Sequence, residues 1–445
     1  GDRVALVLDS SPAYAAAFHG VLLAGGVAVP IPPTLPAERI DELIEWTECR
    51  VRLEDDSPSG RPGRLLLLAS RADVDPSPRD RGPEELAAIL LTSGSTGAPK
   101  GVMLSHANLY ANADAIRRSR LRLDASDRAL VTLPFHHAFG NSILQSHLLT
   151  GSCLVFDPAS TLSPLEAVRR HRVTALYEVP DRCVLLERSL RGAEVPPTLR
   201  FLAVAGGRLA PGLALQLSDS IAPAELIVMY GQTEATARLT CLDPEWLRRA
   251  PGAIGRPIPG VEIQVVDERG REVEPGETGT IRARGPGTCL GYWRDPDGSH
   301  EMLREGWLYT MDRGSVDGFG LLHHAGRADE VVKVGGRRVD LGRLSRDVEA
   351  GAGVDRCVAV PFETAAGAQR IALFVVGSQT QRDTVLEWCR AALHRDERPA
   401  VIEAVEALPI LASGKADAAA LAARARSQWS GGSRAAGVIQ SEREP

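Results

Sequence analysis

The sequence predicts an α/β protein with more than one domain. Hydrophobic runs at residues 4–8 and 27–30, separated by a helical stretch at 11–23, form the strand–helix–strand unit of a parallel sheet. The same alternation of strands and helices returns between residues 129 and 230. The chain of 445 residues exceeds one typical domain, and its hydrophobic content of 44% supports a sizeable core.

The composition argues against several classes of protein. A net charge of −6 and an aromatic content of 4% give neither the basic surface nor the stacking platform of a nucleic-acid-binding protein. No apolar run approaches the ~20 residues that a membrane-spanning helix needs. The seven cysteines are scattered without CxxC spacing, which indicates reduced thiols rather than disulfides or a metal site. We therefore expect a cytoplasmic protein that binds neither nucleic acid nor membrane.

A small polar loop follows the predicted strand at residues 87–91. Glycines let a backbone fold around an anion, and exposed N–H groups and hydroxyls donate hydrogen bonds to it. Lys100 adds a cation at the far end of the loop. We interpret the loop as a polyphosphate clamp, the alternative being a flexible surface turn. The other predicted binding residues of the loop are Thr92, Ser93, Gly94, Ser95, Thr96 and Gly97.

The spacing of this loop, GSTGAPKG at residues 94–101, differs from the two common nucleotide-binding signatures, GxxxxGK before Ser or Thr and GxGxxG. It resembles the phosphate loop of the adenylate-forming superfamily, which comprises acyl- and aryl-CoA synthetases, peptide-synthetase adenylation domains and luciferases. The resemblance implies a large N-terminal domain of stacked mixed α/β sheets at 1–328, with a β-rich subdomain at about 251–328, and a small mobile α+β domain at 329–425. Residues 426–445 are expected to form a disordered tail.

Lysine occurs at only three positions among 51 basic residues: Lys100, Lys333 and Lys415. Lys is a compact, mobile point charge and Arg a planar fork, so the two do not substitute freely where one cation must follow a reacting phosphate. Random retention of three lysines is the alternative. Each of them lies in a separate motif of the resembled family, which favours a functional reason.

The motif LPFHHAFGNS, residues 133–142, follows another predicted strand, at residues 129–133. It resembles the acyl-CoA synthetase form of a motif that borders the acid pocket, with His136 also a candidate catalytic residue. A structural role for the histidines is the alternative. Peptide-synthetase domains for α-amino acids commonly place an Asp here, and its absence disfavours such a substrate. The residues that the resemblance places in the pocket are His136, His137, Phe139 and Asn141.

Two further predicted strands end in candidate nucleotide-binding residues. The strand at 201–205 runs into Gly206 and Gly207, where a flat ligand can approach the backbone, a plain tight turn being the alternative. The strand at 226–230 leads into YGQTE, which matches the YGxTE motif of the family. In this motif Gly231 and Gln232 belong to the nucleotide loop.

The side chains of the YGQTE motif suit the handling of ATP. Tyr230 can stack on adenine, and Thr233 can donate a hydrogen bond to the α-phosphate or the acyl carboxylate. Glu234 can ligate Mg²⁺, which prefers oxygen ligands. Beyond this motif, the segment Gly291, Tyr292, Trp293 is expected to be structural.

A ribose site is implied at GWLYTMD, residues 306–312. The family pattern is Thr-Gly-Asp, with the Asp accepting hydrogen bonds from both ribose hydroxyls, so Asp312 is in place. Met311 replaces a Gly that suits positive φ. Further along, the resemblance assigns Arg327 to ribose or phosphate and Asp329 to a hinge between the domains. It places Lys333, Gly335 and Gly336 in a loop on the side of the thiol acceptor.

The C-terminal LPILASGK, residues 408–415, matches the LPxxxxGK motif of the family. The resemblance implies that Lys415 bridges the carboxylate and the α-phosphate and offsets their charge. The implied reaction joins ATP·Mg²⁺ and a small carboxylic acid to acyl-AMP with release of pyrophosphate. A rotation about Asp329 then admits the thiol of CoA, or of the phosphopantetheine of an acyl or peptidyl carrier protein.

The alternative from another class is a weakened or inactive relative that only binds nucleotide or acid. Met311 in place of Gly, a short N-terminus and Arg343-Leu344-Ser345 in place of an acidic segment motivate it.

Overall fold

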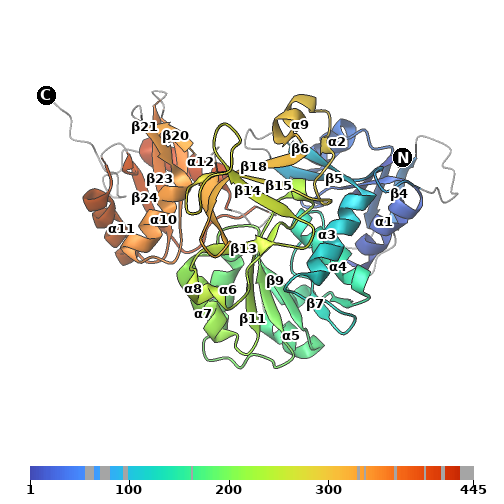
Figure 1. Cartoon of the computed structure of the whole chain (residues 1–445), viewed down its shortest axis with the longest axis horizontal. Helices are drawn as coiled ribbons and strands as arrows, with labels where there is room; N and C mark the ends of the chain where they lie inside the picture. Colours follow the sequence, from blue (N-terminus) through green and yellow to red (C-terminus); the bar gives the residue numbers. More distant parts are fainter. Residues whose placement is uncertain are drawn as a thin grey trace. The chain divides into compact units, whose positions relative to one another are not determined.

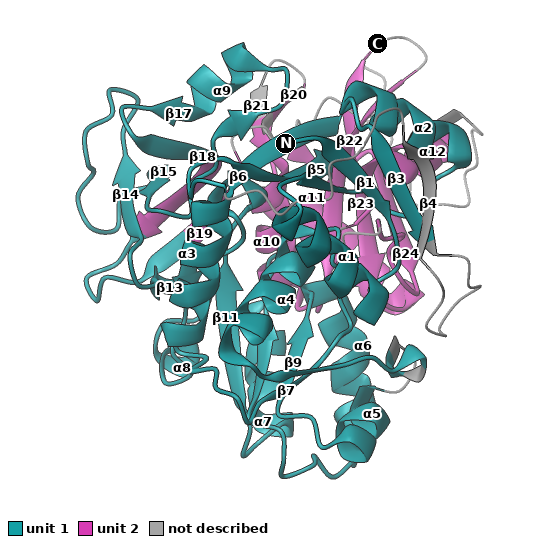
Figure 2. Cartoon of the chain, turned by 90° about the vertical axis from the view of Figure 1, so that its right-hand side faces the viewer, with its two compact units in different colours: residues 1–310, 316–323 teal, residues 311–315, 324–445 magenta. Residues whose placement is uncertain are grey.

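The chain divides into two compact units in the computed structural model (Figures 1 and 2). The first contains residues 1–310 and 316–323, and the second contains 311–315 and the chain from 324 onwards. The residues that the structure describes are 1–55, 65–70, 81–93, 99–161, 164–327, 331–334, 337–364, 368–394, 397–411 and 416–430. The predicted domain boundary, between 328 and 329, lies outside them and stays a prediction.

The first unit opens with the predicted strand–helix–strand pattern. Strands β1, β2, β3 and β5 run parallel, whereas β4, β6 and β16 pair antiparallel with their neighbours. Helices α1 (Pro12–Leu23) and α2 (Ala37–Trp46) connect the first three strands. Across the sheet, the described strands are β16 (Gly291–Tyr292), β6 (Pro99–Ser105), β5 (Leu86–Ser93), β2 (Val27–Pro30), β1 (Arg3–Val7), β3 (Val51–Asp55) and β4 (Leu65–Ser70).

A second, larger sheet begins with parallel strands in the order β8 (Cys153–Val155), β7 (Arg128–Leu130), β9 (Ala175–Glu178), β10 (Phe201–Val204) and β11 (Glu225–Tyr230). It continues through β12 (Thr240–Cys241), β13 (Ala253–Pro257), β19 (Leu322–Arg327), β18 (Trp307–Val316), β15 (Gly279–Arg284) and β14 (Glu262–Val266), with β17 (Leu303–Arg304) paired to β18. Strands β18 and β19 contribute residues to both units.

Helices cover both faces of the parallel strands. On one face Leu176 and Leu202 pack in the same apolar cluster as residues of α6 (Pro180–Leu190) and α7 (Pro211–Ser220). On the other face Tyr177 and Phe201 cluster with residues of α3 (His106–Arg118) and α4 (Ala138–Thr150). The remaining helical segments of this unit are η1 (Pro158–Thr161), α5 (Pro164–His171), η2 (Thr233–Ala235), α8 (Trp246–Arg249) and α9 (Pro296–Met302).

The second unit has a hairpin and a small sheet of its own. Its hairpin pairs β20 (Val331–Val334) with β21 (Arg337–Asp340), and Asp340 caps α10 (Leu341–Ala352) by accepting a hydrogen bond from the Arg343 N–H at 2.8 Å. The sheet and its helices are β22 (Cys357–Glu363), β23 (Gln369–Val376), β24 (Val401–Val405), α11 (Gln379–Ala392) and α12 (Ala418–Ser430).

The predicted tail needs a correction at its start. Helix α12 runs to Ser430, and its Leu421 and Ala425 are buried in the core of the second unit, so residues 426–430 are helical. Residues 431–445 lie outside the described part of the chain. Among the described residues, no helix combines the length and apolar character needed to cross a membrane.

Candidate active site

The predicted phosphate loop joins two antiparallel strands, β5 and β6. Thr92 pairs with Lys100, and the Thr92 hydroxyl donates a hydrogen bond to the Lys100 carbonyl at 3.5 Å. The turn between the strands, with Gly94, Ser95, Thr96 and Gly97, lies outside the described residues, as does the side chain of Ser93. Lys100 therefore lies at the base of a hairpin, and the phosphate clamp itself stays a prediction.

Tyr292 connects Lys100 to Glu234. The Lys100 Nζ lies 4.6 Å from the centroid of the Tyr292 ring, and the Tyr292 hydroxyl donates a hydrogen bond to Glu234 Oε1 at 2.7 Å. The contact arises because β16 pairs with β6, with Tyr292 opposite Val102. Lys100, a predicted phosphate-binding residue, and Glu234, a predicted Mg²⁺ ligand, thus both contact the side chain of Tyr292. The sequence predicted only a structural role for Tyr292, since its partner Glu234 is distant along the chain.

The loop from Gly231 to Arg238 is held by hydrogen bonds from other elements. A Cβ at Gly231 would lie 1.8 Å from the Ala237 carbonyl oxygen, so the loop closes on itself only with Gly there. The Thr236 hydroxyl donates to the Gly287 carbonyl at 2.7 Å. From α3, the Asn112 amide donates to the Arg238 carbonyl at 3.0 Å. The loop is therefore rigidly placed, with Thr233 and Glu234 on it.

Unsatisfied polar atoms occur at several predicted site residues. His136 is 7% exposed, and its Nε2 has no hydrogen-bond partner in the described structure. The amide nitrogens of Asn141 and Gln232 likewise lack a partner among the described residues. A buried polar atom without a partner is free to form a hydrogen bond to a ligand, although such atoms also occur elsewhere in the described structure. Burial, with a smaller contribution from the neighbouring His137, lowers the pKa of His136 to about 3, so this imidazole is neutral near pH 7.

The parallel strands bring three predicted segments to one edge of the larger sheet. The motif with His136 follows β7, Gly206 and Gly207 follow β10, and Tyr230 ends β11. Ligands of such sheets bind beyond the carboxyl ends of the strands. Gly206 has a φ of +87°, a conformation that L side chains rarely adopt, which explains the glycine at this turn.

Strand β9 ends at the same edge in a residue that the sequence did not predict, Glu178. Burial raises the pKa of the Glu178 carboxyl to about 7, and Arg182, whose Nε lies 3.0 Å from Oε2, opposes this shift. The signal in the sequence was an acidic residue inside the hydrophobic run ALYEVP.

In the second unit, Asp312 lies between a histidine and an arginine on the neighbouring strand. Asp312 is 5% exposed, and its Oδ1 lies 3.4 Å from His324 Nε2 and 3.6 Å from Arg327 Nη1. The two predicted ribose residues, Asp312 and Arg327, are thus brought together. Met311 has a φ of +62°, so the residue that replaces Gly keeps the left-handed backbone.

The remaining predicted residues are only partly visible. Lys333 pairs with Arg338 in the β20–β21 hairpin, but its side chain lies outside the described structure. Four more predicted residues also lie outside the described part of the chain: the hinge residue Asp329, the loop glycines Gly335 and Gly336, and Lys415, the predicted catalytic lysine. Their roles stay predictions.

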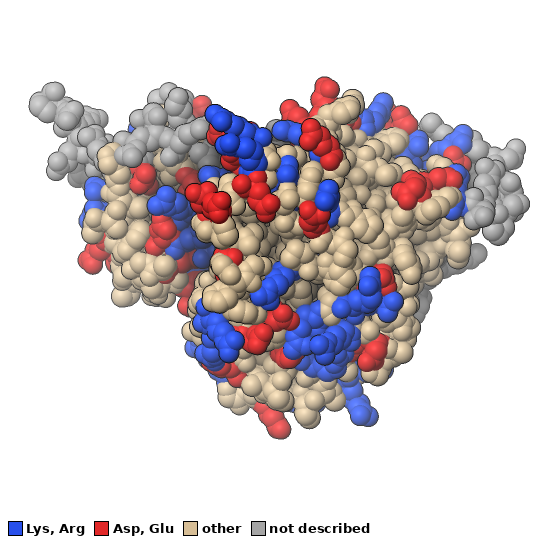
Figure 3. Space-filling view, in the orientation of Figure 1, with Lys and Arg blue, Asp and Glu red and all other residues tan. Residues whose placement is uncertain are grey.

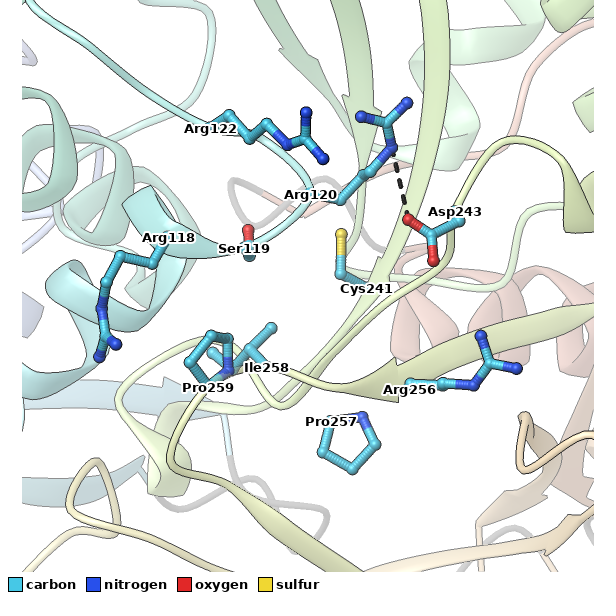
Figure 4. Close-up of a pocket in the computed structure, with 10 residues that line it drawn as sticks. All are labelled: Arg118, Ser119, Arg120, Arg122, Cys241, Asp243, Arg256, Pro257, Ile258 and Pro259. Atoms are coloured by element: carbon cyan, nitrogen blue, oxygen red, sulfur yellow. Dashed lines mark ion pairs between the residues drawn. The ribbon is translucent and has the colours of Figure 1, made fainter.

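A separate cavity of about 280 Å³ opens on the first unit (Figure 4). Four arginines line it, and one of them, Arg120, forms an ion pair with Asp243 at 3.4 Å. Basic side chains also gather on part of this unit in Figure 3. None of the predicted site residues lines the cavity, so it is distinct from the candidate active site.

Comparison with known proteins decides the family. Residues 1–293 match the family model described as AMP-binding enzyme. The chain belongs to the AMP-binding enzyme family. A feruloyl-CoA synthase from an Amycolatopsis species is 30% identical over 434 residues, which cover 93% of this chain and 87% of that protein.

Two other similar proteins are a ligase named for an acyl-carrier protein and an enzyme with a solved structure. A fatty acid–[acyl-carrier-protein] ligase from Streptomyces coeruleorubidus is 29% identical over 445 residues, covering 93% of this chain and 85% of the relative. The ATP-bound MatB structure from Rhodopseudomonas palustris has a TM-score of 0.80 and 27% identity, over 96% of this chain and 90% of that chain.

These likenesses confirm two predictions for this AMP-binding enzyme: the adenylate-forming superfamily and the mixed α/β fold. The predicted class of AMP-forming acid–thiol ligase is confirmed as well. The alternative, a relative that only binds its ligands, is not favoured.

Proposed function

We propose that this AMP-binding enzyme uses ATP and Mg²⁺ to convert a small carboxylic acid to acyl-AMP, and then passes the acyl group to a thiol. The observation that carries the proposal is the linked set Lys100, Tyr292 and Glu234 at the base of the phosphate hairpin. It joins one cation and one carboxylate in a chain whose family binds AMP.

The first step is an in-line displacement at phosphorus. A carboxylate oxygen of the acid bonds to the α-phosphorus, the bond to the β-phosphate breaks, and pyrophosphate leaves with its electron pair. The step needs no protein nucleophile, because the barrier comes from bringing two anions together in the right orientation. Lys100 and the hydroxyls of Thr92 and Thr233 orient the phosphates, and Lys415 neutralises the charge at the reacting oxygens.

The residues present fit a Mg²⁺ ion whose coordination shell is completed by oxygens of the nucleotide. No group of three or more His, Cys, Asp or Glu side chains in the described structure could hold a metal by itself. Glu234, whose Oε1 is fixed by Tyr292, would hold the ion together with phosphate oxygens and water. When bound, Mg²⁺ neutralises charge on the departing pyrophosphate.

The second step forms the thioester. The thiolate sulfur attacks the acyl carbon, and AMP leaves with the electrons of the broken carbon–oxygen bond. We propose a rotation of the small domain about Asp329 that moves Lys415 away and brings the loop of Lys333, Gly335 and Gly336 to the thiol. The acceptor is CoA or a carrier-protein phosphopantetheine, since relatives named for both acceptors are similar to this chain.

The acid is proposed to be an aryl or aliphatic acid without an α-amino group. The pocket motif with His136, His137, Phe139 and Asn141 lacks an Asp to pair with an ammonium. The buried His136 is neutral and offers a hydrogen bond rather than a charge.

Pyrophosphate release, measured with ATP, Mg²⁺ and a panel of aryl, aliphatic and β-amino acids, tests the first step. We expect release that depends on the acid and falls about 100-fold or more in Lys415→Ala, because a charge-neutralising contact is lost. Lys333→Ala provides the contrast: it should keep acyl-AMP formation and slow thioester formation with CoA or holo carrier protein. ATP binding without release for any acid would contradict the proposal.

A further inference from the structure

Arg238 is a buried arginine that has no anionic partner among the residues that the structure describes. Its side chain is 3% exposed, and the described structure gives it no ion pair and no hydrogen-bond partner for Nε. The guanidinium carbon lies 4.9 Å from the centroid of the Phe139 ring, and Nη1 touches the Met229 sulfur. Aromatic and thioether contacts replace only part of the hydration that a buried guanidinium loses.

The other buried arginine among the described residues, Arg382, has the polar partners that a buried guanidinium normally has. Arg382, 8% exposed, donates to the Ile402 carbonyl at 3.1 Å and to the Asp383 carboxylate at 2.6 Å. Buried charges are normally paired in this way because an unpaired one is strongly destabilising. Arg238 is therefore expected to pair with an anion that the described part of the chain does not supply.

Arg238 stays charged in its site. Burial lowers the pKa of Arg238 to about 10, which leaves the guanidinium protonated near pH 7. The groups that face it electrostatically are Cys241 and Tyr177, and burial raises the pKa of the Cys241 thiol to about 11 and that of the Tyr177 phenol still further. Both are neutral near pH 7, so neither compensates the charge.

The position of Arg238 links it to the acid pocket. Phe139 belongs to the predicted pocket motif, Met229 directly precedes Tyr230, and Arg238 ends the loop that carries Thr233. The Asn112 amide holds the backbone carbonyl of Arg238 in place. A guanidinium fixed among these residues can form a bidentate bond to a carboxylate.

We propose that Arg238 binds a second carboxylate of the acid, so that the enzyme selects dicarboxylic acids and activates the carboxylate that points away from Arg238. The inference rests on the proposed function, because the acid pocket is defined there. Arg238 pairs with the distal carboxylate and stays charged throughout, while the other carboxylate reacts with ATP.

The test compares matched pairs of acids in the pyrophosphate assay. Each pair contains an aromatic or a short linear dicarboxylic acid and its monomethyl ester, which keeps the carbon skeleton, removes one charge and adds one methyl group. For the wild type we expect kcat/KM to be about 10- to 100-fold higher for the diacid, the range of a charge-assisted buried hydrogen bond. In Arg238→Met, of similar volume, the preference should vanish through loss of diacid activity, with the ester little affected.

Two further variants separate recognition from folding. Arg238→Lys keeps the charge and should retain part of the preference, and Arg382→Met, at the paired buried arginine of the second unit, should leave it unchanged. A wild type that uses esters as well as diacids would overturn the inference even if no variant folds. So would an Arg238→Met variant that keeps the preference.

The outcome also distinguishes failure of the inference from failure of the proposed function. Ester-dependent pyrophosphate release without a diacid preference would leave adenylation intact and exclude this role for Arg238. If no acid supports pyrophosphate release, the unfolding temperature is measured with each diacid alone. A diacid that raises the unfolding temperature of the wild type but not that of Arg238→Met supports the anion site. A wild type whose unfolding temperature no diacid raises refutes it.

Discussion

Two stretches predicted to hold the nucleotide are the YGQTE motif, whose loop continues to Arg238, and the ribose segment at 306–312. Each contains or adjoins a non-glycine residue at positive φ, but in a different setting. Thr236, with φ of +64°, is buried, and its hydroxyl donates to the Gly287 carbonyl. Met311, with φ of +62°, has a side chain that is 51% exposed. A positive φ is costly for a residue with a Cβ, and at Thr236 a specific side-chain hydrogen bond offsets this cost, whereas at Met311 the side chain is half exposed.

The largest expected effect is at Thr236. Thr236→Val keeps the shape but removes the donor, leaving the Gly287 carbonyl unsatisfied and the strain without compensation. We expect a loss of about 2 kcal/mol in the free energy of unfolding, measured by urea denaturation. Thr236→Ser keeps the hydroxyl and is the matched control. Equal losses in the two variants would show that the hydrogen bond does not offset the strain.

The next largest effect is expected for the hydrogen bond from Tyr292, on β16, to Glu234 in the loop that also contains Thr236. Tyr292→Phe removes the hydroxyl that holds Glu234 Oε1 but keeps the ring beside Lys100. We expect about a 10-fold fall in kcat for pyrophosphate release, the cost of one lost hydrogen bond, together with a higher Mg²⁺ requirement. Tyr309→Phe, at a tyrosine whose hydroxyl accepts from Arg282, serves as the control. An unchanged Mg²⁺ titration in Tyr292→Phe would show that Tyr292 does not position Glu234.

At Met311 we expect a substitution that stabilises the protein rather than one that destabilises it. Met311→Gly restores the residue that adopts positive φ without strain, and we expect a gain of about 1 kcal/mol in the free energy of unfolding. Thermal or urea unfolding measures it, and Met311→Ala, which keeps a Cβ, should show little gain. A destabilised Gly variant would mean that the flexibility of the unfolded chain outweighs the relief of strain.

The smallest effect is expected from titration of His136. Because the pKa of His136 is lowered to about 3, its imidazole carries no proton charge between about pH 5 and pH 8. The pH profile of kcat/KM should therefore have the same shape in wild type and in His136→Asn across this range, whatever the change in its height. An acidic limb near neutral pH that disappears in His136→Asn would contradict this assignment.

Much of the first unit could be predicted because its strands are continuous apolar runs followed by turn residues. Strand β7 is shorter than the predicted 129–133, since the chain leaves the sheet at Val131 for the histidine motif. Strand β6 was not predicted, because Pro99 and Gly101 at its start suggest a loop. The predicted phosphate loop consequently lies between two strands that pair antiparallel with each other, an arrangement that its own residues do not reveal.

Candidate site residues could be named from the sequence where they lie in one short motif, and not where a contact joins distant segments; their roles stay predictions. YGQTE and Asp312 could be read directly from the sequence. Tyr292, Glu178 and Arg238 could not, because their importance depends on burial and on partners that only the folded chain supplies.

The position of helix α3 between the β5–β6 hairpin and Arg238 has a consequence for ligand affinity. It begins directly after β6, where Ser105 and Asn108 form a capping box, and its Asn112 holds the carbonyl of Arg238. Because α3 connects the end of β6 to the backbone of Arg238, a displacement of the β5–β6 hairpin on ligand binding would also displace the segment proposed to select the acid. Any resulting gain in affinity is reciprocal: the acid must tighten ATP by the same factor as ATP tightens the acid.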